Sequence, residues 1–178
     1  MNLPKQYAWL ADEPGPRILK TMLSIHGTKE SPGITNNPAI MAWGKTAGMP
    51  KGYTDDSVPW CGWGLAYVAL ESGWGLPINP LWARNWATWG NPITKDKAML
   101  GDVLVFARGS AGHVALYVGE DATQFHIIGC NQDDQVSIKR RAKAQLLAVR
   151  RCPWRTAQPS NVRKIQLAAV GSVAKSEA

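Results

Sequence analysis

The order of the periodic segments constrains the fold of this chain more than any other feature of its sequence. Helical spacing of apolar residues predicts helices over 15–25, 39–46 and 60–72, and a short helix or tight turn over 82–89. Alternating apolar residues predict strands over 102–107, 113–118, 125–129, 135–139 and 146–151. Helices first and strands second favour an α+β domain with an antiparallel sheet over a parallel sheet with interleaved helices.

One domain accounts for most of the chain. Its 178 residues suffice to bury a hydrophobic core, and 45% hydrophobic and 19% charged residues are typical of a globular protein. The periodic patterns weaken after Trp154. We therefore expect a domain over 1–155 and a basic tail over 156–178, which is either a weak amphipathic helix around 162–174 or frayed. We expect the protein to be a monomer.

The first ten residues bear on where the protein works. They mix polar and aromatic residues and lack the basic start and apolar stretch of a secretory signal. No apolar run is long enough to span a bilayer. The sequence therefore predicts synthesis in the cytoplasm, and any work outside it requires another route of export.

Positive charge gathers near the C-terminus. The net charge is +7 and the sequence pI is about 9.5. Half of the 20 basic residues lie from Lys139 onward, where Glu177 is the single acid. Such charge favours an anionic partner. The alternatives are a solvated basic face and attraction of the tail to an anionic envelope surface. No nucleic-acid-binding motif accompanies the charge, so we expect no nucleic-acid partner.

The three cysteines, Cys61, Cys130 and Cys152, predict thiols rather than a disulfide framework or a zinc site. Their number is odd, and no two have CxxC spacing. The acidic pair Asp55 and Asp56 lacks the ligand spacing of a calcium loop. We therefore expect no metal and no cofactor, with one thiol available for chemistry.

Cys61 is the candidate nucleophile because it falls at the junction of a loop and a predicted helix. A helix N-terminus presents backbone N–H groups and the positive end of the helix dipole, which favour a thiolate over a thiol. The same N–H groups can hold the oxyanion of a tetrahedral intermediate. The alternative is a buried cysteine that acts only as a small apolar residue.

His113 is the candidate general base. It begins the predicted strand GHVALYVG, in which alternation places His113, Ala115 and Tyr117 on one face and Val114, Leu116 and Val118 on the other. An imidazole at the start of a strand can reach a neighbouring helix start. The alternative is a histidine that only hydrogen-bonds to backbone at the strand end.

A third residue is needed to fix the tautomer of the imidazole and aim it at the sulfur. The candidates follow on the next strand and its exit: His126, Asn131 and Gln132, with Asp102 a weaker one. We favour Asn131, because an amide oxygen accepts the ring N–H without adding charge. Gln132 and His126 remain open, either for this role or as substrate-binding residues.

Five tryptophans flank the expected cleft in the sequence: Trp60, Trp63, Trp82, Trp86 and Trp89. Tryptophan faces suit sugar rings and peptide stems, since both present C–H-rich surfaces. Of the five we assign Trp60 and Trp63, beside the nucleophile, to substrate binding. The alternative for each is a place in the core.

These motifs, in this order, resemble the CHAP and NlpC/P60 superfamily of papain-like cell-wall hydrolases, and most closely a subgroup common among bacteriophage endolysins. The resemblance covers about residues 7–154. It rests on Asn36–Asn37–Pro38, DDSVPWCGW, ARNWATWG, GDVLVFARG, GHVALYVGED, IIGCNQDDQVSIKR and 151–154. One departure is Cys130, where the subgroup has glycine and where a side chain is expected to crowd the turn before Asn131.

The resemblance implies Cys61 as nucleophile, His113 as general base and a polar residue near Asn131 as the orienting group. It implies cleavage of amide bonds in peptidoglycan, either at the muramoyl–L-alanine amide or within the stem peptide. An endolysin without a leader waits in the host cytoplasm and reaches the wall once the membrane is permeabilised. The alternatives are a non-catalytic peptidoglycan-binding module and a toxin amidase or acyltransferase on the same scaffold.

Overall fold

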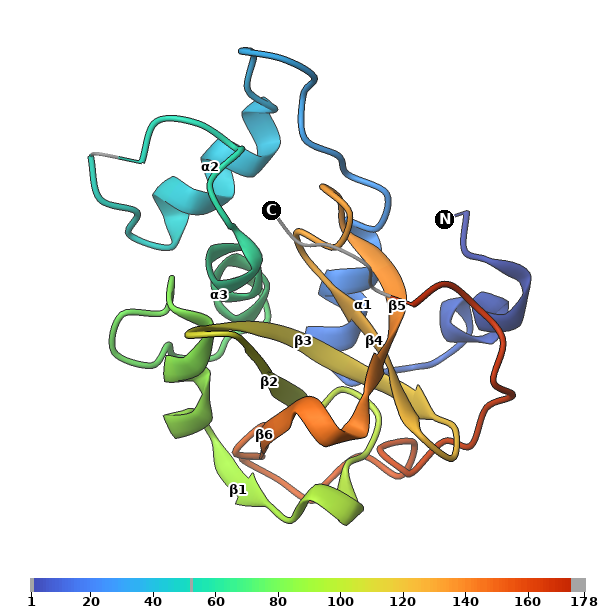
Figure 1. Cartoon of the computed structure of the whole chain (residues 1–178). Coiled ribbons are helices and arrows are strands. Elements are labelled where there is room, and N and C mark those ends of the chain that lie inside the picture. Colours follow the sequence, from blue (N-terminus) through green and yellow to red (C-terminus); the bar gives the residue numbers. More distant parts are fainter. Residues whose placement is uncertain (1, 52, 174–178) are drawn as a thin grey trace.

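The computed structural model describes residues 2–51 and 53–173, and its helices precede most of its sheet (Figure 1). The helices are α1 (Arg17–Ser24), α2 (Pro38–Thr46) and α3 (Cys61–Glu71). Short 3-10 turns are η1 (Lys5–Ala11), η2 (Ala83–Thr88), η3 (Lys95–Lys97) and η4 (Lys143–Gln145). The strands are β1 (Asn91–Ile93), β2 (Val103–Arg108), β3 (Ala111–Glu120), β4 (Gln124–Gly129), β5 (Ser137–Ala142) and β6 (Leu146–Arg151).

The six strands form one sheet in the order β1-β6-β2-β3-β4-β5, and every neighbouring pair is antiparallel. The predicted α+β class with an antiparallel sheet is therefore confirmed. β2 and β3 form a hairpin in which Phe106 lies opposite His113. Register between β3 and β4 places Gly119 opposite His126. His113 therefore lies near one end of β3, and Gly119 lies near the other end.

The two faces of the sheet carry two separate apolar clusters. Val114, Leu116 and Val118 belong to the cluster that includes the three helices, whereas Ala115 and Tyr117 belong to the other. This is the alternation that the sequence predicts. Figure 1 shows α3 between the sheet and α2, and α3 contacts α1, α2, β3 and β4. No described helix has the length and apolar character needed to cross a membrane.

Helix α3 is the central helix because apolar and small residues surround it. Its buried positions run through most of its length: Cys61, Gly62, Trp63, Gly64, Leu65, Ala66, Val68 and Ala69. A helix that is apolar on all sides has to lie in the core. It ends where Gly73 adopts a φ of +81°, the left-handed conformation that commonly closes a helix. The buried position of α3 fixes where Cys61, its first residue, can lie.

The loop before α2 is held by side chains that hydrogen-bond to backbone N–H groups. Asn37 caps α2 by accepting the Ala39 N–H at 2.8 Å. The buried Asp56 carboxylate accepts the backbone N–H groups of Ser31 at 3.1 Å and Asn37 at 2.7 Å. Asp56 therefore fastens two loops together. Among the described residues, no cluster of three or more acidic, histidine or cysteine side chains is arranged to hold a metal ion.

Residues 156–173 follow an extended path along the domain and contain no helix, so the amphipathic helix considered for this segment is wrong over its described part. The backbone N–H of Glu120 donates to the Ile165 oxygen at 2.9 Å, and that of Arg140 donates to the Ser172 oxygen at 2.9 Å. Gln6 also donates to the Val170 oxygen at 3.0 Å. Figure 1 shows this red segment passing beside the blue η1.

Much of the C-terminal positive charge is neutralised within the molecule. The basic residues in ion pairs with acids are Lys139, Arg140, Lys143, Arg151, Arg163 and Lys164. Their partners are Asp133, Asp121, Glu120, Asp102 and Glu13. Less of this charge is therefore available to an anionic surface than the sequence count suggests.

Candidate active site

Cys61 is the first residue of α3 and is almost buried, with 5% of its surface exposed. Trp60 occupies the N-cap position and its side chain does not cap the helix. The first-turn N–H groups of a helix point out of its end, and the dipole makes that end positive. Cys61 thus has the environment expected for a nucleophilic thiol.

Gly62 allows the loop before η2 to pack closely against the start of α3. A Cβ atom at Gly62 would lie 2.2 Å from the Leu81 backbone oxygen and 2.8 Å from that of Pro80. Only glycine permits the chain at 80–82 to approach so closely. The loop before η2 is consequently pressed against the start of α3, directly beside Cys61.

His113 is fully buried, and its Nε2 lies 3.3 Å from the Oε1 of Gln132. The Gln132 amide nitrogen donates to the Ser137 oxygen at 2.6 Å and more weakly to the Gly129 oxygen at 3.4 Å. Because both amide hydrogens have carbonyl acceptors, the amide oxygen is turned toward the imidazole. The ring hydrogen then lies on Nε2, and Nδ1 carries the lone pair that a general base needs.

Asn131 contacts the start of α3 rather than the imidazole. With its amide oriented to meet its donors, its oxygen accepts the backbone N–H of Trp60 at 3.2 Å and the indole N–H at 3.0 Å. Asn131 has a φ of +54°, a left-handed conformation that asparagine tolerates. The turn therefore sends the side chains of Asn131 and Gln132 to different partners.

The turn after β4 joins the two candidate catalytic elements. Cys130 lies against α3, since a Cβ at Gly64 would be 2.4 Å from its sulfur. Asn131 contacts Trp60 and Gln132 contacts His113. Gly64 thus makes the room that Cys130 needs, and the crowding expected from this cysteine is absorbed by the helix. Trp60, the residue before Cys61, and His113 therefore both contact this one turn.

His126 belongs to a different part of the molecule. It lies opposite Gly119, six residues along β3 from His113, which is about 20 Å along a strand. Its Nδ1 lies 2.7 Å from the Tyr7 hydroxyl and its Nε2 lies 3.1 Å from Asp121. His126 therefore does not orient His113, and it does not line the cleft beside Cys61. Asp102 is also engaged elsewhere, in an ion pair with Arg151.

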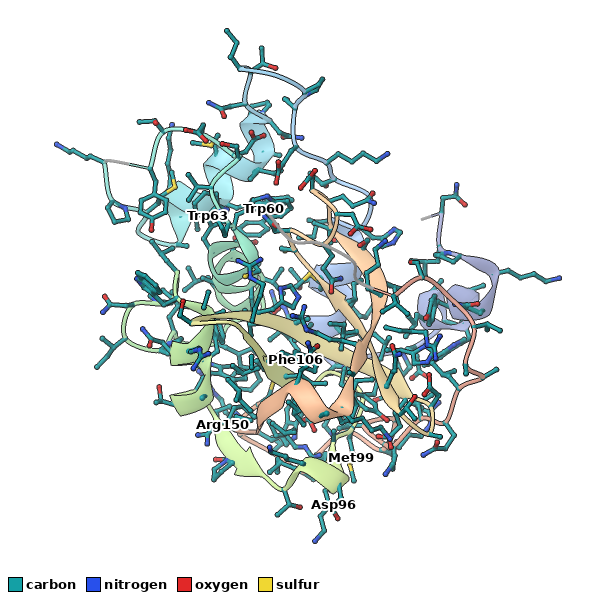
Figure 2. The ribbon with its side chains drawn as sticks, in the orientation of Figure 1. Trp60, Trp63, Asp96, Met99, Phe106 and Arg150 are labelled. Carbon is teal, nitrogen blue, oxygen red and sulfur yellow. The ribbon has the colours of Figure 1, made fainter. Side chains whose placement is uncertain are left out.

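Trp60 and Trp63 are core residues rather than an open platform. Their exposed fractions are 0% and 1%, and Figure 2 shows both at the start of α3, next to α2. The Trp60 ring lies 6.2 Å from that of Trp43 on α2. Trp60 thus packs α2 on α3, and Trp63 packs against Tyr53, with the two ring centres 5.8 Å apart. The exposed member of the group is Trp82, at 66%.

A hollow of ≈ 210 Å³ opens at Cys61. Its described lining consists of Tyr53, Val58, Pro59, Cys61, Leu81, Trp82, Ala83, Arg108, Ala111 and Gly112. A second hollow of ≈ 210 Å³ shares Tyr53, Leu81 and Trp82 with the first, so the two are continuous along one wall. The largest described hollow, ≈ 460 Å³ around Glu13 and Arg163, contains none of the candidate residues. The groove at Cys61 is therefore the candidate substrate cleft.

The thiols and the imidazole differ in their electrostatics. Burial raises the pKa of Cys130 well above its usual value and that of Cys152 to about 12, which makes both poor nucleophiles at neutral pH. Burial, followed by the positive charge of Arg141 and then of Arg108, holds the pKa of His113 well below its ordinary 6.5. His113 is therefore neutral, and able to accept a proton, at and below neutral pH.

This depressed pKa predicts the acid limb of the pH profile. We expect kcat/KM to fall only below pH 6.5, because His113 stays neutral there. Arg141→Gln removes a charge that opposes protonation, so its limb should move to higher pH, whereas Arg155→Gln, an exposed charge outside the cleft, should leave it in place. Stability should also decline as pH falls below 6.5, since the unfolded chain then binds protons that folded His113 does not. The dependence of kcat/KM on pH, measured for wild type and both variants, checks the acid limb, and unfolding measured over the same pH range checks stability. An acid limb that does not move in Arg141→Gln would contradict the role given to Arg141.

One solved structure with a similar fold is the crystal structure of the P60 domain from an M. avium paratuberculosis antigen. The sequences are 18% identical, the TM-score is 0.50, and the match covers 82% of this chain and 95% of that chain. At this identity the likeness concerns the fold, which is that of a P60 domain. No protein-family model matches the chain, and no curated protein matches it by sequence.

Proposed function

We propose that this chain is a cysteine-dependent hydrolase that cleaves amide bonds in the peptides of bacterial cell-wall peptidoglycan. The observation that carries the proposal is the turn at 130–132, which contacts the residue before Cys61 and also holds the imidazole of His113 through Gln132. The P60-like fold, together with the resemblance of residues 7–154 to cell-wall hydrolases, supports the choice of substrate.

The reaction proceeds through an acyl-enzyme. Nδ1 of His113 takes the thiol proton of Cys61, and the sulfur attacks the scissile carbonyl. Backbone N–H groups at the start of α3 stabilise the oxyanion. Collapse of the tetrahedral intermediate breaks the C–N bond, and the imidazolium gives its proton to the departing amine. A water, deprotonated by His113, then attacks the thioester carbonyl and releases the acid and the thiol.

Gln132 is the orienting residue in this scheme, in place of Asn131. Its amide is fixed by two backbone carbonyls and aims its oxygen at Nε2 of His113. In the proposed scheme Cys61, His113 and Gln132 act as a papain-like triad, in which a neutral amide fixes the tautomer. Asn131 instead positions the helix start through Trp60.

Gln132→Leu should lower kcat by about 10²-fold with little change in KM, because the imidazole loses its fixed tautomer and direction. The buried Ser137 backbone oxygen then loses a donor, so a fall in stability of about 1–3 kcal/mol is also expected. Gln132→Glu keeps an acceptor at Nε2 and adds a negative charge, so it should retain more activity and move the acid limb to higher pH. It also loses the donors to the Ser137 and Gly129 oxygens, so it should be destabilised as Gln132→Leu is. Steady-state kinetics and thermal unfolding measure these effects. Equal loss in both variants at unchanged pH dependence would indicate a purely structural role for Gln132.

Digestion of purified peptidoglycan tests the function. Fragments identified by mass spectrometry distinguish an N-acetylmuramoyl-L-alanine amidase, which releases intact stem peptides, from a stem-peptide endopeptidase, which leaves truncated stems on the glycan. Cys61→Ala, which lacks the proposed nucleophile, is the inactive control. Intact peptidoglycan after incubation with folded wild-type protein would exclude the proposal.

In the cell we propose the role of a phage endolysin, which acts on the wall after the membrane is permeabilised. The resemblance at 7–154 supports it. Trp60 and Trp63 are buried and offer no face to a glycan, so a non-catalytic binding module would depend on the exposed Trp82. A toxin amidase or acyltransferase would share the first step and differ in the acceptor.

A further inference from the structure

Glu30 contacts the residue that precedes the proposed nucleophile. Its Oε1 accepts the indole N–H of Trp60 at 2.6 Å, a short bond for a nitrogen donor. Trp60 is fully buried and occupies the N-cap position of α3, directly before Cys61. A half-buried carboxylate from the loop before α2 therefore reaches the start of the helix that carries the sulfur.

The loop that carries Glu30 is paired with the loop between β4 and β5. The Glu30 N–H donates to the Asp134 oxygen at 2.9 Å, and the Gly27 N–H donates to the Val136 oxygen at 2.9 Å. In return, the Val136 N–H donates to the Thr28 oxygen at 2.8 Å. These backbone bonds fix the direction from which Glu30 approaches Trp60, so its side chain loses less freedom on making the bond.

The Trp60 indole also connects Glu30 to the turn that orients the imidazole. The same indole N–H reaches the Asn131 oxygen at 3.0 Å, and that oxygen accepts the Trp60 backbone N–H at 3.2 Å. The next residue of the turn, Gln132, faces His113. The start of α3 is thus held from two sides, by the loop before α2 and by the turn that holds the base.

The surroundings of Glu30 oppose its ionisation. Burial raises the pKa of Glu30, the hydrogen bond from Trp60 lowers it, and the carboxylates of Asp134 and Asp56 raise it further. A carboxylate in such surroundings lowers folding stability unless its bonds compensate. An acid that is unfavourable for the fold, and is fixed against the residue before the nucleophile, indicates a role in the reaction.

We infer that Glu30 is a positioning residue of the hydrolase, which fixes the start of α3 relative to His113 through the Trp60 indole. The inference rests on the proposed function. In the reaction scheme the backbone N–H groups at that helix end stabilise the oxyanion beside Cys61, so a small rotation of the helix start misplaces both the sulfur and these donors. Glu30 takes no part in the proton transfers. It acts through geometry, which a neutral acceptor can also supply.

Two neutral substitutions separate the hydrogen bond from the charge. Glu30→Leu removes both, whereas Glu30→Gln keeps an oxygen that accepts the indole N–H. We expect Glu30→Leu to lower kcat by about 10- to 100-fold with KM within about 2-fold of wild type, because misplaced groups act on the transition state. Glu30→Gln should keep kcat within about 3-fold, since a neutral acceptor makes a weaker bond in the same direction. Equal loss in both variants, or no loss in folded Glu30→Leu, overturns the inference.

Glu13→Leu is the matched control for stability. Glu13 is a buried carboxylate that accepts Arg163 at 2.8 Å and Asn161 at 2.9 Å, and it lines the ≈ 460 Å³ hollow rather than the groove at Cys61. Its loss should lower stability in denaturant unfolding and leave kcat within about 2-fold of wild type. If Glu13→Leu lowers kcat as much as Glu30→Leu at the same loss of stability, the effect is general destabilisation and the inference is wrong.

Labelling of Cys61 with iodoacetamide at neutral pH separates the inference from the function on which it rests, because it needs no substrate. The rate should be about 2- to 5-fold lower in Glu30→Leu than in Glu30→Gln, the range of a helix-end interaction with a charge. If wild-type protein cleaves no peptidoglycan, the function is excluded and the labelling rates decide: a slower Glu30→Leu supports the positioning role, and equal rates overturn it. Where Glu30→Leu does not fold, Trp60→Phe removes the same bond from the donor side, and wild-type kcat and labelling in that variant overturn the inference.

Discussion

Cys61→Ala should lower peptidoglycan hydrolysis by about 10³-fold or more while the fold is retained, because the sulfur that forms the acyl-enzyme is gone. The substitution removes one atom from a side chain that borders a hollow, so neighbouring groups lose little packing. We expect unfolding temperature to change little. Release of soluble peptide fragments, measured on the same peptidoglycan preparation, gives the size of the loss.

The other two cysteines provide the control for this prediction. Burial raises the pKa of Cys152 to about 12 and that of Cys130 well above its usual value, so neither should react with iodoacetamide at neutral pH. Labelling of the native protein should therefore modify Cys61 first and stop activity, and Cys152→Ala should remain active. Activity that persists in Cys61→Ala, or is lost on labelling of Cys152 alone, would contradict the assignment.

Gly62→Ala should cost about 3 kcal/mol of folding stability and most of the activity. Alanine favours a helix by about 1 kcal/mol over glycine, so propensity alone would make the change stabilising. The new Cβ would instead lie 2.2 Å from the Leu81 oxygen and 2.6 Å from its carbon, and neither is the end of a flexible side chain. Overpacking against backbone outweighs the helix preference. Relief requires the start of α3 or the loop at 80–82 to move, and either movement displaces Cys61 relative to the cleft.

Gly75→Ala is the matched control, because a Cβ there meets nothing within 4 Å and the residue has no positive φ. Its stability should stay within about 0.5 kcal/mol of wild type. Denaturant unfolding of both variants, with kinetics on the same samples, measures the effects. A Gly62→Ala protein as stable and active as wild type would show that the contact between α3 and Leu81 is dispensable.

Local patterns predicted the helices and most strands because these depend on short-range periodicity. Helix 60–72 is found as α3 at Cys61–Glu71, and strand 102–107 as β2 at Val103–Arg108. The strand expected at 135–139 begins at Ser137, because Val136 pairs with the loop after α1: its N–H donates to the Thr28 oxygen at 2.8 Å. Strand β1 was missed, since three residues with a central proline give no periodic signal.

The segment after 155 shows how distant partners override a weak pattern. Its spacing favours a helix only slightly, and the backbone instead bonds to Glu120 and Arg140, residues tens of positions earlier. An extended segment can pair its N–H and C=O groups with those of an existing sheet. A short isolated helix of low propensity, by contrast, is only marginally stable. No local count of apolar residues contains that information.

The sequence by itself determined the α+β order, the two faces of β3, and the placement of Cys61 at a helix start and His113 near the start of a strand. Only the tertiary structure decided that Gln132 rather than Asn131 meets the imidazole, that Trp82 rather than Trp60 is exposed, and that Arg108 lines the cleft. The physical reason is the range of the interactions. Periodicity is fixed by neighbours a few residues apart, whereas the left-handed turn at Asn131, the packing of α2 on α3 and the path of the β2–β3 hairpin depend on segments that meet only when the whole chain has folded.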